Sequence, residues 1–192
     1  MSSLKRKTFV AREDLLNRLS TIASRKGFSL YDTVNDILEQ AISIDESGLT
    51  LKNMVDECEQ VESAKKAGFI LCPERLWYDL TELSYKKSRE ASMETWYETG
   101  EWLGKQYVET IPKDPFSKFK KDLRAFVWNA ADLTIKEDKK NLSISIVSPK
   151  FSEAYSRLLA FLLQGTLEVF GYRPVNSEIG RGNIQITTVR AE

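Results

Sequence analysis

Histidine is absent from this 192-residue sequence, and cysteine occurs only twice. Without histidine the chain lacks the commonest metal ligand and the commonest general base at neutral pH. Cys58 and Cys72 are too few for a disulfide framework and are not spaced as a CxxC pair. The sequence also has neither a GxSxG motif nor a phosphate-binding P-loop. We therefore expect no metal, no cofactor and no enzymatic activity.

Long hydrophobic runs are absent too. No apolar run reaches the roughly 18 to 20 residues that a membrane span requires. The first letters, MSSLKRK, are basic and do not resemble the apolar segment of a secretory signal. These features predict a cytoplasmic protein that does not contact a membrane. The composition, 42% hydrophobic and 29% charged, is that of a globular chain with room for one domain and a small appendage.

Charge is balanced over the whole chain, with 28 basic and 28 acidic residues, but it is distributed unevenly. Residues 1–30 contain seven basic and two acidic residues, a net charge of +5. Residues 31–62 contain nine acidic residues and one lysine, a net charge of −8. An acidic segment repels nucleic acid, so any contact with phosphate is expected within the first thirty residues.

The N-terminal stretch KRKTFVA has the alternation of a short strand, at residues 5–11. It places Arg6, Thr8 and Val10 on one face and Phe9 on the other. A helix is expected to follow and to end at Gly27, a residue suited to a left-handed cap. A second helix is expected to open at Ser29, where the S-x-x-D pattern is typical of a capping box, and to run to about residue 43.

The predicted strand has no partner nearby in the chain. Its two helices are also too short for a core of their own, because chains below roughly 40 residues seldom form one unaided. A second copy of the protein would solve both problems. Two strands would pair antiparallel about a two-fold axis and bury Phe9 of each chain against four helices. We therefore expect a homodimer.

The segments KRKTFVAREDLL, IASRKGFS and LYDTVNDILEQAI resemble the ribbon-helix-helix transcription regulators related to the Arc and MetJ repressors. The resemblance covers residues 5–43 without a gap. It implies a ribbon in the major groove of double-stranded DNA, with Arg6, Thr8 and Val10 facing the bases. Val10 departs from the family pattern, in which a polar residue is common, and would contact only a thymine methyl group.

The same resemblance implies contacts with the DNA backbone. The N–H groups of Ser29 and Leu30 would hold a phosphate at the start of the second helix. Lys5 and Lys7 flank the base-facing residues and are expected to reach phosphates. The alternative interpretation is a solvated basic tail followed by a helical hairpin that packs on the rest of the chain.

The remainder of the chain predicts a separate α+β domain, so we divide the chain into a ribbon-helix-helix domain (1–45) and a dimerisation domain (46–192). A hinge is expected at SIDESG, followed by a helix to about Gly68 and by a short strand or extended segment at FILCP. One long helical region should then end at Pro112 and Pro115. Beyond it we expect strands at 123–136 and 141–147, an apolar helix after Ser148-Pro149, and a hairpin turning at 180–182. This order predicts a helical layer on a small antiparallel sheet.

The ending FGYRPVNSEIGRGNIQIT resembles the four-vinyl-reductase-like domains and the Bet3-type subunits of the TRAPP tethering complex. Some members of that superfamily bind small apolar ligands. The cysteines that many of them carry near this ending are absent here, so no role that rests on them is transferred. Five aromatic residues of the helical region are then expected to line a pocket for a small apolar ligand: Trp77, Trp96, Tyr97, Trp102 and Tyr107. The alternative is that they serve as core packing and as a dimer interface.

These interpretations converge on a homodimeric, sequence-specific transcription regulator, whose C-terminal domain dimerises and senses a ligand. The competing hypothesis is an antitoxin or an assembly subunit, whose C-terminal domain binds another protein.

Overall fold

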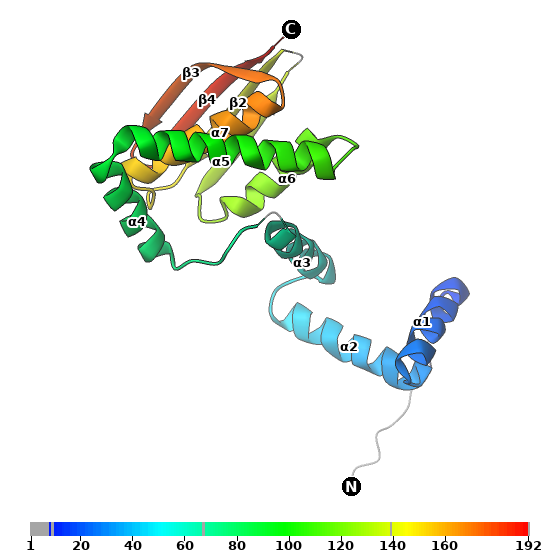
Figure 1. Cartoon of the computed structure of the whole chain (residues 1–192). Helices are drawn as coiled ribbons and strands as arrows, with labels where there is room; N and C mark the ends of the chain where they lie inside the picture. The colour runs from blue at the N-terminus through cyan, green and yellow to red at the C-terminus, as the bar shows by residue number, and fades with distance from the viewer. Residues whose placement is uncertain (1–7, 9, 67, 139, 192) are drawn as a thin grey trace. The chain divides into compact units, whose positions relative to one another are not determined.

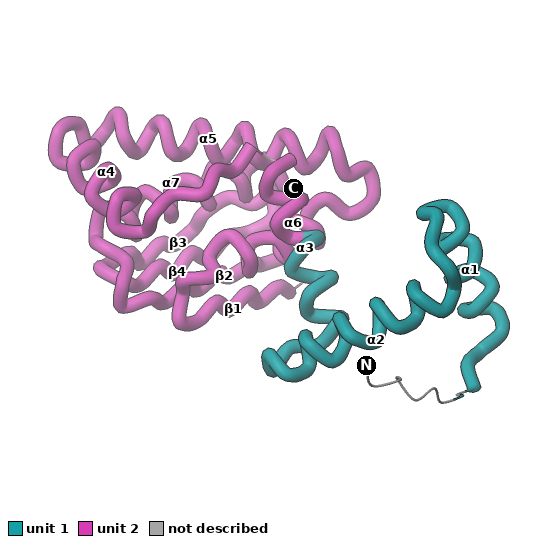
Figure 2. The backbone as a smooth tube through the Cα atoms, turned by 90° about the horizontal axis from the view of Figure 1, so that it is seen from below, with its two compact units in different colours: residues 1–59 teal, residues 60–192 magenta. Residues whose placement is uncertain are grey.

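The computed structural model of the chain describes residues 8, 10–66, 68–138 and 140–191. Within those residues it contains seven helices and one four-stranded antiparallel sheet (Figure 1), which confirms the expected α+β class. The chain forms two compact units, Met1–Glu59 and Gln60–Glu192, which Figure 2 colours separately. None of the described helices has the length and apolar character that a membrane crossing requires.

Unit 1 begins with two helices, α1 (Glu13–Lys26) and α2 (Leu30–Glu46). Gly27 ends α1 in the left-handed conformation, with φ 77°, because a residue without a Cβ adopts that conformation at little cost. Ser29 then caps α2: its Oγ accepts a hydrogen bond from the Asp32 N–H at 3.0 Å and donates one to the Asp32 carboxylate at 2.6 Å. Both sequence-predicted boundaries are confirmed.

Helix α2 runs to Glu46, so most of the segment expected to be a hinge is helical. The chain turns only at Ser47 and at Gly48, whose φ is 75°. Helix α3 (Leu51–Lys66) follows and crosses the boundary between the two units at residue 59. The described residues of the segment after it, up to Pro73, form no strand.

Two helices occupy the region that the sequence predicted as one long helix: α4 (Glu74–Lys87) and α5 (Arg89–Thr110). A third helix, α6 (Pro115–Phe126), follows this region. An extended residue, Ser88, separates α4 from α5. The expected break is confirmed, since α5 ends at Thr110, before Pro112. Pro115 then begins α6, because proline lacks only an N–H that the first turn does not need. The Asp114 side chain caps this helix by accepting from the Ser117 N–H at 3.1 Å.

The predicted strand at 123–136 is therefore wrong over its first nine residues. Residues 123–126 belong to α6, and strand β1 begins only at Asp132 (Asp132–Glu137). Phe119 and Leu123 lie one helical turn apart and are both buried, so helical spacing fits this segment better than alternation. The predicted strand at 141–147 is confirmed as β2 (Asn141–Val147).

The final hairpin is also confirmed, as β3 (Tyr172–Gly180) and β4 (Asn183–Arg190). The strand order is β1-β2-β4-β3, which leaves β1 and β3 at the two edges. In the central pair, Ile144 lies opposite Ile186 and Ile146 opposite Ile184. These side chains are fully buried, because one face of the sheet is covered by helices (Figure 1).

The covering helices form two layers. Helix α7 (Glu153–Val169) packs on the sheet and α5 packs along α7 (Figure 1). The contact between α5 and α7 is unusually close, because glycines lie at the crossing: Gly100 and Gly104 on α5, and Gly165 on α7. The fully buried hydroxyl of Thr166 lies 3.0 Å from the Gly100 carbonyl oxygen and joins the two helices there.

Candidate functional site

The residues predicted to contact DNA lie at the N-terminal end of unit 1. Lys5, Arg6 and Lys7, like Phe9 on the opposite face, fall outside the described residues. Thr8 and Val10 have no regular secondary structure in the single chain, and Val10 is 98% exposed. The predicted strand would pair with the same strand of a second chain. The structure describes a single chain, so this strand remains a prediction.

The predicted phosphate site lies at the start of α2. Leu30 is the first residue of this helix, and helix geometry leaves its N–H without an acceptor inside the helix. Ser29 is exposed beside it. The carboxylate of Asp32 lies at the same helix end, where its charge opposes that of an approaching phosphate.

An apolar hollow of about 160 Å³ opens between α1 and α2. Every side chain around it is hydrophobic: Ala11, Leu15, Leu16, Leu19, Val34, Ile37 and Leu38. In these two helices only Ala23 is fully buried, and Leu15, Ile37 and Leu38 are each more than 40% exposed. Contiguous apolar surface of this kind is characteristic of an interface.

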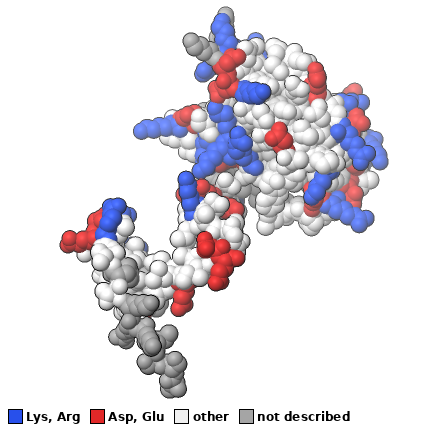
Figure 3. Space-filling view, turned by 180° about the vertical axis from the view of Figure 1, so that it is seen from behind, with Lys and Arg blue, Asp and Glu red and all other residues white. Residues whose placement is uncertain are grey.

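Charge in unit 1 separates along the helices. Basic residues end α1, at Arg25 and Lys26, whereas the last turn of α2 contains none. Figure 3 shows acidic side chains gathered on the part of unit 1 that contains α2 and α3. The end of α1 is therefore basic, whereas its first turn contains Glu13 and Asp14. The acidic charge on α2 and α3 repels a polyanion there.

The aromatic residues predicted to line a pocket have different neighbours in unit 2. Trp77 on α4 and Trp96 on α5 lie together, with ring centroids 5.6 Å apart, and Trp96 packs edge-on against Tyr155 of α7. Trp102 is 47% exposed. The Tyr97 hydroxyl donates to Glu168 at 2.7 Å, which helps to fasten α5 to α7. The hollow between α1 and α2 is lined by other residues, and so is a hollow between α6 and β1.

Sequence reasoning missed three members of the aromatic cluster around Trp96. Tyr78 lies on α4, Phe151 on the loop before α7, and Tyr155 on α7. Tyr155 was placed on an apolar helix but was not linked to the tryptophans. Phe151 follows a Ser-Pro pair, and no local pattern marks it as buried. The cluster joins three segments distant in sequence, so it is a property of the tertiary fold.

Tyr107 belongs to a buried polar network. Its hydroxyl donates to the Asp122 carboxylate at 2.7 Å, and Lys118 Nζ donates to the same carboxylate and to Ser63 Oγ at 2.9 Å. Burial, together with the bond to Asp122, raises the pKa of Tyr107 above its usual range. The network ties α5 to α6 and to the end of α3, and it explains why a charged residue is buried there.

No known family matches the sequence, and no curated protein is significantly similar to it. Within the part of the chain that the structure describes, no three carboxylate or cysteine side chains are grouped so that they could hold a metal ion.

Proposed function

We propose that this protein is a homodimeric, sequence-specific DNA-binding transcription regulator of the ribbon-helix-helix type, that it acts in the cytoplasm and that it is not an enzyme. The observation that carries the proposal is the apolar hollow between α1 and α2, directly after a strongly basic N-terminal segment. A helical pair with an open apolar face needs a partner, and a basic segment beside it favours DNA.

The partner that best fits the hollow is a second copy of the chain. The described apolar face consists of aliphatic side chains, and the sequence places Phe9 two residues before the first of them, Ala11. In a symmetric dimer, Phe9 of both chains and the two helical pairs would together enclose one core. Chains shorter than roughly 40 residues rarely fold unaided. The strands and helices of two chains together exceed that size, so the dimer can form a core that one copy cannot.

In the complex with double-stranded DNA, the ribbon would lie in the major groove with Arg6, Thr8 and Val10 toward the bases. Lys5 and Lys7, with the N–H groups of Ser29 and Leu30, would contact phosphates. Unit 2 would strengthen the dimer and sense a small apolar ligand. Selection of bound fragments from random DNA at a stated salt concentration tests binding and identifies the operator together.

Arg6→Ala is expected to weaken binding to the selected operator by about 1 to 3 kcal/mol, because a bidentate contact with a base edge contributes about that much discrimination. Its affinity for random DNA should fall much less. Lys5→Ala provides the matched control, since a lost phosphate contact weakens all DNA alike and flattens the salt dependence. Equal losses on operator and random DNA for Arg6→Ala would exclude base readout by this residue.

Ile37→Lys is expected to weaken the dimer at least about tenfold, because an unpaired charge buried in an apolar interface costs more than about 1.4 kcal/mol. Ile37 is 41% exposed in the single chain, so the fold of the monomer should survive the change. The matched control is Ser43→Lys, which adds the same charge at an exposed position on another face of α2. Sedimentation equilibrium measures both variants, and dimerisation of Ile37→Lys as tight as that of Ser43→Lys would contradict the proposed interface.

A second candidate function is protein binding by unit 2, as in an antitoxin or an assembly subunit. Ile70 and Leu71 are 85% and 92% exposed. Close behind them in sequence, Leu76, Leu80 and Leu83 form an exposed apolar stripe on one face of α4. A protein that co-purifies with the full chain, and is lost on Leu80→Lys but not on Ile37→Lys, would favour this function over the first.

A further inference from the structure

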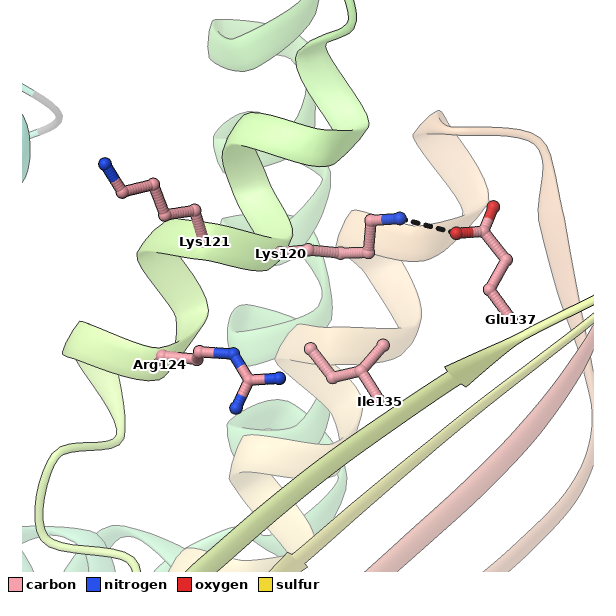
Figure 4. A pocket seen from close by; sticks show the side chains of 5 residues that line it. All are labelled: Lys120, Lys121, Arg124, Ile135 and Glu137. Atoms are coloured by element: carbon pink, nitrogen blue, oxygen red, sulfur yellow. Dashed lines mark hydrogen bonds and ion pairs between the residues drawn. The ribbon is translucent and has the colours of Figure 1, made fainter.

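A basic hollow of about 350 Å³ opens between α6 and the edge strand β1, entirely within unit 2. Its lining consists of three basic residues, one carboxylate and one aliphatic side chain (Figure 4): Lys120, Lys121, Arg124, Glu137 and Ile135. Figure 4 shows Arg124 directed toward Ile135 of β1, whereas Lys121 points away from β1 at the rim. The DNA-binding proposal does not involve this part of the molecule.

Lys120 is fixed in place by its neighbours. Its ammonium group forms an ion pair with Glu137 and lies 4.7 Å from the centroid of the Phe116 ring. Glu137 in turn accepts a hydrogen bond from the Tyr172 hydroxyl at 2.9 Å. The hydrogen bond from Lys120 holds the pKa of Glu137 below its usual range, so this carboxylate is charged at neutral pH. Glu137 therefore balances one of the three positive charges.

The other two cations lack such a partner. Among the described residues, neither Lys121 nor Arg124 forms an ion pair with a carboxylate. Arg124 donates from Nη1 to the Leu133 carbonyl oxygen at 3.5 Å, which is the limit for a hydrogen bond. The hollow thus has a net charge of +2 from its lining, with the forked donors of a guanidinium available above an aliphatic floor.

We propose that this hollow binds a small phosphate monoester, with the phosphate held by Arg124, the organic group packed against Ile135, and Lys121 adding a positive charge at the rim. An arginine fork matches the oxygens of a phosphate, and an added lysine supplies a second charge without a fixed geometry. A volume of about 350 Å³ is within the usual range for small-molecule sites. This ligand differs from the small apolar ligand expected for the aromatic residues. The two ligands would occupy different sites, because the residues that line the basic hollow are not the aromatic residues.

Isothermal titration calorimetry on the full-length protein, at constant ionic strength, tests this proposal with two probes, inorganic phosphate and phenyl phosphate. Constant ionic strength is needed because salt screens exposed charges. Arg124→Gln should weaken phenyl phosphate at least about tenfold, since a hydrogen bond to a charged group contributes about 1.5 to 3 kcal/mol. Arg173→Gln is the matched control, because it removes an exposed arginine from β3, at the opposite edge of the sheet.

Phenyl phosphate should bind more tightly than inorganic phosphate, because only its ring can contact Ile135. Equal affinity for the two probes would overturn the monoester assignment, and equal affinity of Arg124→Gln and Arg173→Gln would overturn the site. Should Arg124→Gln fail to fold, Lys121→Gln replaces it, since Lys121 is exposed at the rim. The absence of binding heat with both probes would overturn the small phosphate ligand. The calorimetric measurements do not involve DNA. They can therefore be interpreted even if the proposed DNA binding fails.

Discussion

Gly165→Ala should lower the free energy of unfolding of unit 2 by about 3 kcal/mol or more, at or above the upper end of the usual range for overpacking. A Cβ at this position would lie 2.2 Å from the Tyr97 carbonyl oxygen and 3.1 Å from the Glu101 backbone nitrogen. Both obstacles are backbone atoms of α5, which cannot rotate away as a side chain can. The two helices would have to separate, and the buried faces of α5 and α7 would lose contact.

Urea unfolding followed by tryptophan fluorescence measures this loss. Gly180→Ala is the matched control, because a Cβ there would meet no atom within 4 Å and the backbone is not left-handed. We expect the control to change the free energy of unfolding by less than about 0.5 kcal/mol, as is usual for substitutions that disturb no packing. Similar stabilities of the two alanine variants would show that α5 and α7 are not as close as the structure places them.

Asp122→Ala should be the next most destabilising change. It should lower the free energy of unfolding by about 3 kcal/mol, which is the lower end of the range for breaking a buried ion pair. The side chain of Asp122 is 3% exposed. Its removal leaves the Tyr107 hydroxyl without its acceptor and the Lys118 ammonium group without its counter-charge, with only Ser63 Oγ to accept from it. The side chain of Lys118 is 32% exposed and can turn partly toward water. We therefore do not expect a loss of stability at the upper end of the range for broken buried ion pairs. Asp122→Asn should lose less, because an amide oxygen still accepts from Tyr107.

The pH dependence of stability provides an independent measurement on the same network. Because the pKa of Tyr107 is raised in the folded state, its contribution is fully present below about pH 10, the value for an unfolded tyrosine, and is lost as the pH rises further. Tyr107→Phe should therefore have a smaller loss of stability between about pH 9 and 11 than the unmodified protein. Identical pH profiles would contradict the burial of the Tyr107 hydroxyl together with its bond to Asp122.

These two sites join the helices of unit 2 to one another. The glycine contact joins α5 to α7, and the Asp122 network joins α5 to α6 and to the end of α3. Helix α3 continues from there into unit 1. A ligand in unit 2 would control DNA binding only if it favoured one state of the chain over another, and α3 is the segment through which such a preference would be transmitted.

Local chemistry in the sequence determined several elements. Gly27 ended α1 because glycine adopts the left-handed conformation readily, and Ser29 opened α2 because its hydroxyl accepts from a backbone N–H of the first turn. The alternation in LSISIV placed β2, and the glycine turn placed the final hairpin, because side-chain period and turn geometry are both short-range properties. The α+β class followed from these elements alone.

Only the tertiary structure decided the rest. Residues 123–126 could extend a strand by local preference, but burial of Phe119 and Leu123 in the core fixed them as helix. No sequence pattern distinguished the tryptophans and tyrosines of the helical region from one another. In the fold, Trp96 packs in an aromatic cluster, Tyr97 donates to a carboxylate and Tyr107 belongs to a buried polar network. The basic hollow joins α6 to β1 across a turn that the sequence placed inside a strand. A site of this kind depends on contacts between segments, and no pattern within one segment specifies which others will lie beside it.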